Sequence, residues 1–156
     1  MNVKEILKKR LEKLDKHYMA LKEYKDLIDE ILQEKNIYDK KIYSELLPVQ
    51  RAVLDAYLKR FSSCQDFMGA KILGLLLELA GIGSDKMSEI IQRCEKEQII
   101  DDVNIWIELR AKRNELEHDY PDEIEDTLED LKYCIDSFSK LEQYYQNILE
   151  FYKRFS

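Results

Sequence analysis

Residues 3–34, VKEILKKRLEKLDKHYMALKEYKDLIDEILQE, decide the fold class before any other part of the chain. Their apolar side chains mostly recur at spacings of three and four residues, which is the period of one helix face. These side chains are Val3, Ile6, Leu7, Leu11, Leu14, Tyr18, Leu21, Ile28 and Ile31. Charged residues fill most of the other positions, as on the solvated side of a packed helix. We therefore predict one long amphipathic helix over residues 3–34.

The rest of the chain continues in helical segments, since only 4 glycines and 2 prolines interrupt its 156 residues. Residues 36–47 form a connector with room for a short helical turn. Pro48 suits the first turn of a second long helix, and Gly81 and Gly83 suit its end.

Three further helices are predicted over about residues 84–97, 102–118 and 121–156. Ser84 or Asp85 is expected to cap the first of them. The chain contains no repeat or linker-like segment, and its length suits one domain. We therefore predict an all-α fold, a single domain over residues 1–156 built as an up-and-down bundle of four to five helices.

The three cysteines, Cys64, Cys94 and Cys134, lie 30 and 40 residues apart. That spacing argues against a zinc site or a disulfide framework, and it favours a reducing compartment. Residues 1–16 are charged throughout, unlike a signal peptide, and the most apolar stretch, residues 72–82, is too short to cross a bilayer. We expect a cytoplasmic protein with buried thiols, no membrane segment, and no bound metal or cofactor.

The charge of the chain is unevenly distributed. The formal net charge is −7, whereas residues 1–60 have a balance of +3 and residues 101–130 a balance of −9. Nucleic-acid-binding proteins are usually basic, so the total charge does not indicate one. The acidity is concentrated around the polar cluster described next.

That cluster is RNELEHDY, residues 113–120. Arg113 follows Trp106 and Leu109 at helical spacing, so it lies on an otherwise apolar stripe. A guanidinium in such a place needs an anionic or polar partner. Two interpretations stay open from the spacing alone. Arg113 forms a structural ion pair with a nearby carboxylate, or it awaits a ligand anion such as phosphate, which suits its planar fork.

Asn114 and His118 are four residues apart and share one helix face, so the amide is placed to orient the imidazole or bind a phosphate. His118 falls at the predicted helix end, which favours the imidazolium form. Arg113 and His118 are roughly 140° apart on a regular helix. They converge only if the last turn unwinds before Pro121 or if a second subunit supplies the missing group.

RNA cleavage by transesterification needs a base, an acid and a cation near the phosphate. One histidine cannot be base and acid at once. A two-fold dimer brings two copies of every group to its axis, which would supply both histidines and both arginines without a metal. A homodimer is therefore expected.

Residues 99–121, IIDDVNIWIELRAKRNELEHDYP, resemble the signature region of the HEPN domain family. The similarity is closest to HepT-type toxins of HEPN–MNT toxin–antitoxin pairs, whose motif is Arg, Asn, three residues, His, one residue and Tyr. Residues 61–81, FSSCQDFMGAKILGLLLELAG, are loosely similar to the second long helix of that family. The resemblance covers roughly residues 50–135.

The resemblance implies a dimeric HEPN-like bundle that acts as a metal-independent endoribonuclease toxin in a type VII-like system. It also implies an antitoxin partner, a small MNT-type nucleotidyltransferase. Carried over residue by residue, Arg113 would bind the scissile phosphate, His118 would be the general acid and base, and Asn114 would support them. Tyr120 would be the residue that the partner adenylylates.

Several carboxylates surround the motif: Glu115, Glu117, Asp119, Asp122 and Glu123. Carboxylates near a phosphate site repel RNA unless they are paired or face away. This favours an alternative, a non-catalytic helical subunit, because some relatives are described as substrate-binding subunits of nucleotidyltransferases. A further alternative is a helical interaction module in which Arg113 and His118 are structural.

Overall fold

The computed structural model describes the backbone of residues 1–118 and 123–156 and the side chains of residues 1–116 and 123–156. Every regular element in these ranges is a helix, and no strand occurs among them. The prediction of an all-α fold is confirmed for the described part of the chain. No helix in these ranges has the length and apolarity that crossing a membrane would require.

The first two elements follow the predicted pattern. α1 (Val3–Glu34) begins after Asn2, whose side chain accepts a hydrogen bond from the amide of Glu5 at 2.9 Å. Its buried residues all belong to the predicted stripe: Leu7, Leu11, Leu14, Tyr18, Leu21 and Ile28. The connector contains one short helix, α2 (Lys40–Ser44), which Asp39 caps.

The second long helix begins at Pro48 as predicted, but it is not α-helical throughout. α3 (Pro48–Phe67) passes through a π-helical turn, η1 (Met68–Ile72), into α4 (Leu73–Leu79). A π-helical turn closes each hydrogen bond over one more residue than an α-helical turn, so it changes which side chains face the core. The helix ends before Gly81, whose φ of +78° is favourable for glycine.

The next two helices are α5 (Met87–Lys96) and α6 (Val103–His118). The predicted cap of the first is wrong, because α5 begins at Met87 rather than directly after Ser84 or Asp85. The Ser84 hydroxyl instead donates a hydrogen bond to the carboxylate of Glu89, which lies in the first turn of the helix. The predicted position of α6 is confirmed.

The prediction of one continuous C-terminal helix is wrong. The chain forms α7 (Ile124–Asp136) and α8 (Phe138–Phe155), with a break at Ser137. The Ser137 hydroxyl donates a hydrogen bond to the carbonyl of Tyr133 at 2.6 Å. A serine that bonds back to the preceding turn competes with the regular helical ladder and bends it, which explains the break.

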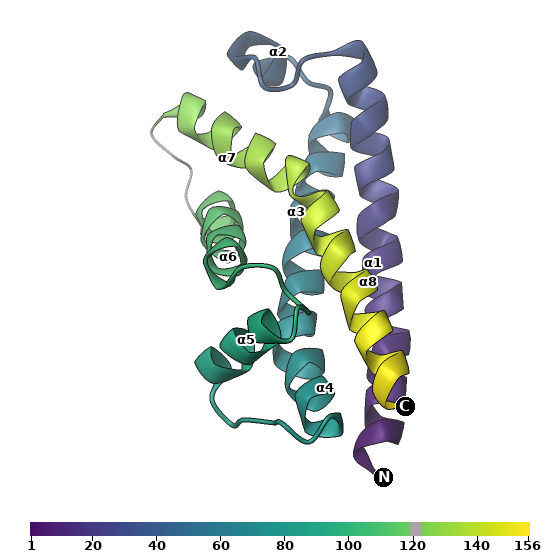
Figure 1. Cartoon of the computed structure of the whole chain (residues 1–156). Coiled ribbons are helices and arrows are strands. Elements are labelled where there is room, and N and C mark those ends of the chain that lie inside the picture. The colour runs from purple at the N-terminus through teal and green to yellow at the C-terminus, as the bar shows by residue number, and fades with distance from the viewer. Residues whose placement is uncertain (119–122) are drawn as a thin grey trace.

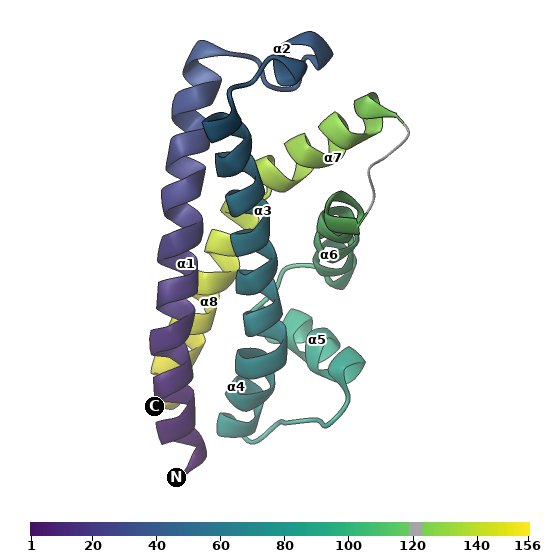
Figure 2. The same ribbon diagram turned by 180° about the vertical axis from the view of Figure 1, so that it is seen from behind.

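The helices form a bundle in which three long segments lie alongside one another (Figures 1 and 2). α1 runs antiparallel to the α3–α4 segment, and α8 lies along both. α6 is seen almost end-on in both views, so it crosses the long helices instead of continuing the up-and-down pattern. Within the described ranges there are six main helical segments, counting α3 to α4 as one and leaving out α2. The sixth segment, beyond the predicted four to five, results from the break at Ser137.

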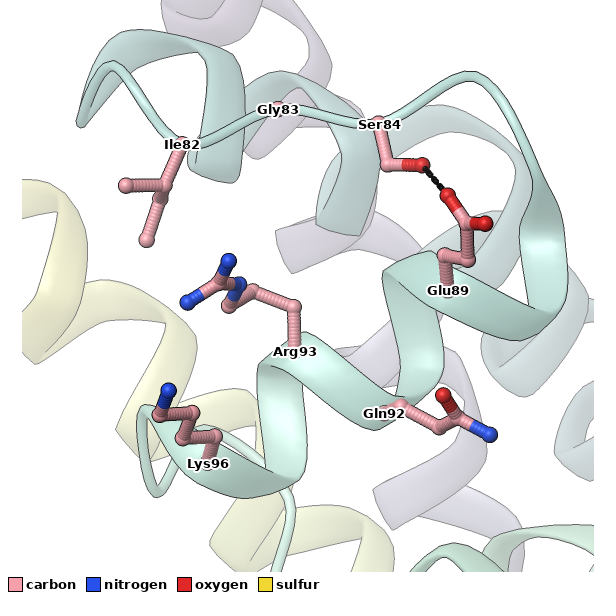
Figure 3. Close-up of a pocket in the computed structure, with 7 residues that line it drawn as sticks. All are labelled: Ile82, Gly83, Ser84, Glu89, Gln92, Arg93 and Lys96. Atoms are coloured by element: carbon pink, nitrogen blue, oxygen red, sulfur yellow. Dashed lines mark hydrogen bonds between the residues drawn. The ribbon is translucent and has the colours of Figure 1, made fainter.

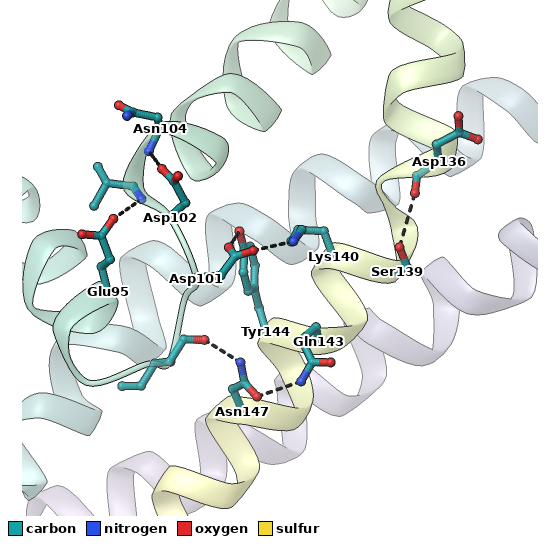
Figure 4. A network of polar contacts seen from close by, with 12 residues as sticks. Glu95, Asp101, Asp102, Asn104, Asp136, Ser139, Lys140, Gln143, Tyr144 and Asn147 are labelled. Carbon is teal, nitrogen blue, oxygen red and sulfur yellow. Dashed lines mark hydrogen bonds and ion pairs between the residues drawn. The ribbon is translucent and has the colours of Figure 1, made fainter.

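One hydrophobic cluster joins buried side chains of all six segments. Cys64, Cys94 and Cys134 are buried and free of disulfides, as predicted. A polar network ties the loop before α6 to α8 (Figure 4). In it, Asp101 accepts hydrogen bonds from Lys140 and from the Tyr144 hydroxyl, and the Asn147 side chain donates to the carbonyl of Ile99 at 3.1 Å. The network fixes where α6 begins.

Candidate functional site

Arg113 lies on the packed face of α6, as its spacing predicted. Trp106 and Leu109 on the same face are buried, and Arg113 itself is only 2% exposed. It is the one buried residue with a formal charge among the residues whose side chains are described. A buried guanidinium is costly unless it is paired and hydrogen-bonded, so its partners determine what it does.

The partners of Arg113 lie on α3. Its Nη1 donates a hydrogen bond to the carbonyl of Ser62 at 2.6 Å, and its Nη2 forms an ion pair with Asp66. Its Nε is buried and has no hydrogen-bond partner among the described residues. The structure therefore contains the structural ion pair that was one of the two predicted alternatives. The proposed contact with a phosphate stays a prediction.

Gln65 adds a second polar contact between the same two helices. Its side chain is 1% exposed, and its Nε2 donates to the carbonyl of Trp106 at 3.0 Å. Its Oε1 is buried without a partner among the described residues. Ser62, Gln65 and Asp66 thus form one polar turn of α3 against α6. This turn was not predicted, although polar residues at spacings of three and four inside an apolar helix are a signal for it.

A small cavity lies beside the ion pair, with a volume of about 180 Å³. It is lined by Gln65, Asp66, Gly69, Ala70, Met87, Trp106 and Arg110. Gly69 belongs to the π-helical turn, and a Cβ atom there would lie 3.2 Å from Cζ2 of Trp106. The missing side chain therefore lets the turn approach the Trp106 ring closely. The carboxylate of Asp66, the guanidinium of Arg110 and the Trp106 ring therefore line one cavity beside the Arg113–Asp66 ion pair.

Two of the other predicted site residues, Asn114 and His118, follow Arg113 along α6. Asn114 is exposed, next to Arg113 in sequence but off its buried face. His118 is the last residue of α6, and its side chain is outside the described set. Tyr120 lies outside the described residues altogether. The backbone stays helical through His118, so Arg113 and His118 keep the unfavourable rotation of roughly 140° that regular geometry gives them.

An ion pair connects α6 with the helix that follows the motif. Lys112 of α6 and Asp130 of α7 form an ion pair at 3.2 Å, and the pKa of Lys112 is raised by that contact. The pair joins the two helices on either side of residues 119–122. Glu115 and Glu123 are exposed. Among the described side chains, no group of three or more His, Cys, Asp or Glu is placed to hold a metal ion.

A second cavity, of about 390 Å³, lies between the loop after α4 and the outer face of α5 (Figure 3). It is lined by Ile82, Gly83, Ser84, Glu89, Gln92, Arg93 and Lys96. The nitrogen atoms of Arg93 and Lys96 lie at one end of it, and the hydrogen bond between Ser84 and Glu89 lies at the other. None of these lining residues belongs to the predicted motif.

Of the predicted site residues, Arg113 is the one with described side-chain contacts. Its guanidinium makes all of them with α3. The resemblance of residues 99–121 to the HEPN signature stays a prediction. No protein-family model, no curated protein and no solved structure matches this chain.

Proposed function

We propose that this chain is a HEPN-type endoribonuclease that acts as the toxin of a HEPN–MNT pair. The proposal rests on one observation. The Arg113 motif lies at the end of a helix whose backbone stays regular through His118, and on a regular helix these two positions are turned roughly 140° from each other. A homodimer placing two such helix ends at its axis would bring the two groups together, which makes the second subunit part of the site.

In the proposed reaction, one His118 imidazole takes the proton of the ribose 2′-hydroxyl. The 2′-oxygen then attacks the adjacent phosphorus, and the bond to the 5′-oxygen of the next nucleotide breaks. The His118 of the second subunit gives its proton to that leaving oxygen. Arg113 stabilises the added negative charge of the phosphorane. The products are a 2′,3′-cyclic phosphate and a 5′-hydroxyl, and no metal takes part.

The burial of Arg113 makes a specific demand on this mechanism. Its guanidinium already contacts Asp66 and the Ser62 carbonyl, so it reaches RNA only if the ion pair opens or dimerisation rearranges it. In the proposed enzyme, contact between the two subunits would therefore have to move the Arg113 guanidinium toward the RNA. The partner nucleotidyltransferase would silence the enzyme by adenylylating Tyr120, whose attached phosphate would compete for the same cation.

The test is cleavage of a labelled RNA by purified protein in excess EDTA, combined with light scattering. We expect a dimer at micromolar concentration and cleavage that survives chelation. The His118→Ala variant should be inactive with an unchanged melting temperature. A strict monomer would contradict the composite site. Activity that is lost to EDTA and restored by magnesium would contradict the assigned chemistry.

The same ion pair favours a second candidate function. A guanidinium neutralised inside its own chain is typical of a structural role, and the segment around it is acidic. The chain would then be a non-catalytic helical subunit that binds an MNT-type nucleotidyltransferase. Stable co-purification with that enzyme, together with no RNA cleavage and no growth arrest on expression, would favour this function over the first.

A further inference from the structure

One face of the molecule, formed by α1 and by α3 with its π-helical turn, gathers cationic side chains around an aromatic ring. The two segments lie side by side along this face (Figure 2). We call it the basic face, and it consists of Arg10, Lys13, His17, Arg60, Phe67 and Lys71. On α1 its members are three and four residues apart, and on the other segment they are seven and four apart, so each set follows one side of its helix.

Contacts between the two segments place these side chains together. The Phe67 ring is central: the His17 ring lies 5.0 Å from it between centroids, and the Lys13 Nζ lies 5.9 Å from its centre. Arg10 donates a hydrogen bond to the carbonyl of Lys71 at 3.0 Å. Burial lowers the pKa of His17, and the positive charges of Arg60 and Lys13 lower it further, which places both cations near the imidazole.

The cations of the basic face are not neutralised within the chain. Among the residues that the structure describes, Arg10, Lys13, Arg60 and Lys71 form no ion pair with a carboxylate. Farther along α1 the pattern differs, because each lysine there has an acidic partner four residues on: Lys22 with Asp26 and Lys25 with Asp29. Adjacent unpaired cations repel one another, and a polyanion would relieve that repulsion.

We propose that the basic face binds the phosphate backbone of single-stranded RNA, and that the exposed part of the Phe67 ring, which otherwise packs against the core, stacks on a base. Cationic side chains beside an aromatic ring are a combination that single-strand-binding proteins use. The chain has a net charge of −7, so the positive charge of this face is local and the protein as a whole is not basic. The choice of RNA among polyanions rests on the proposed ribonuclease function.

The basic face and the Arg113 site use consecutive residues of α3 that point to different neighbours, because Phe67 contacts His17 of α1 and Asp66 contacts Arg113 of α6. Phe67 belongs to the basic face, and the preceding residue, Asp66, lines the cavity beside Arg113 and pairs with it. A strand that crosses α3 at this level would therefore run from the basic face to the end of α6 that carries the motif. In a dimer this face would hold the part of the RNA outside the cleavage site.

The test is fluorescence anisotropy of the full chain with a labelled 2′-O-methyl RNA, which lacks the nucleophile and is not cleaved. The variant K13E/R60E removes two contacts, and K41E/K86E is a control with the same change in net charge. We expect about tenfold weaker binding for the first and a salt slope smaller by about 1.4, as for two lost phosphates, with the control close to wild type. Phe67→Leu should weaken binding about fivefold by removing one stacked base.

Three results would overturn the inference: no RNA binding by the wild type, equal losses in the two double variants, or vesicles of phosphatidylserine binding more tightly than RNA through Lys13 and Arg60. Binding and cleavage are separate measurements here. RNA that binds through the basic face without being cleaved by the wild-type protein would support this inference while removing the ribonuclease proposal.

Discussion

Arg113 of α6 and Asp66 of α3 form an ion pair whose two ends lie in different surroundings. The Arg113 side chain is 3% exposed, whereas the Asp66 side chain is 57% exposed. Water can therefore solvate Asp66 if its partner is removed, but it cannot reach the guanidinium if Asp66 is lost. The cost of breaking this pair depends on which residue is changed.

Asp66→Asn is expected to lower the free energy of unfolding by about 1–3 kcal/mol, because it leaves a buried guanidinium without its carboxylate. Arg113→Met keeps much of the packed volume and frees an exposed carboxylate, so it should change stability by less than about 1 kcal/mol. Urea unfolding of both variants measures the difference. A larger loss for Arg113→Met would contradict the assigned environments.

If Arg113 binds the scissile phosphate, the Arg113→Met variant is also inactive, and Arg113→Lys recovers only part of the activity.

If the active site is shared between two subunits, inactive chains are expected to lower the activity of the wild-type chains with which they form dimers. When nine His118→Ala chains are mixed with each wild-type chain, cleavage per wild-type chain should fall to about a tenth, since few wild-type chains find a wild-type partner. Chains should be mixed under conditions that exchange subunits, which light scattering on tagged chains verifies. Activity proportional to the amount of wild-type protein would show that each subunit works alone.

Tyr120 is expected to be the adenylylated residue. Incubation with the partner nucleotidyltransferase, ATP and magnesium should add one AMP to the chain, which peptide mass spectrometry locates. The adduct should abolish cleavage, because it places a negative phosphate and a bulky base near the motif. Tyr120→Phe should escape this inactivation. Covalent silencing of that variant, or an adduct on another residue, would remove Tyr120 from the role.

His17 should make the fold less stable in mild acid. Burial and the neighbouring Arg60 and Lys13 lower its pKa in the folded state below the usual 6.5. The unfolded chain therefore binds a proton more readily, and the free energy of unfolding falls as the pH drops below about 6.5. His17→Asn should lose less stability between pH 7.5 and pH 5.5 than the wild type does. An identical loss in both proteins would contradict this explanation.

The cysteines should be inert in the native protein. Burial raises the pKa of Cys64 and that of Cys94 to about 12, so almost no thiolate is present at neutral pH. An aromatic disulfide reagent is expected to label none of the three thiols until the protein is unfolded, and then to label all of them. Fast labelling of the folded protein would show that the core opens readily.

The sequence predicted the elements whose signals are local. The spacing in residues 3–34, the position of Pro48 and the glycines at 81 and 83 were sufficient to place the first two long helices, although not the π-helical turn within the second. The break at Ser137 was missed because it depends on one hydroxyl bonding back to Tyr133 within an unbroken apolar pattern. Periodicity alone does not detect such a bond.

The candidate site was also predicted only in part. The stripe through Trp106 and Leu109 placed Arg113 correctly on a buried face. Its partner, Asp66, lies 47 residues earlier, and no spacing rule connects two helices that meet only after folding. The basic face was missed for the same reason, since half of its cations come from each of two helices.

The π-helical turn at residues 68–72 has a consequence for tracing the ancestry of this chain. Such a turn contains one more residue than an α-helical turn. A one-residue insertion into a helix would produce the same difference. A relative with one residue fewer between Cys64 and Leu76 would keep the packing on both sides of the turn. An alignment that forbids gaps within helices would shift its register at this point and would misplace Asp66 relative to Arg113.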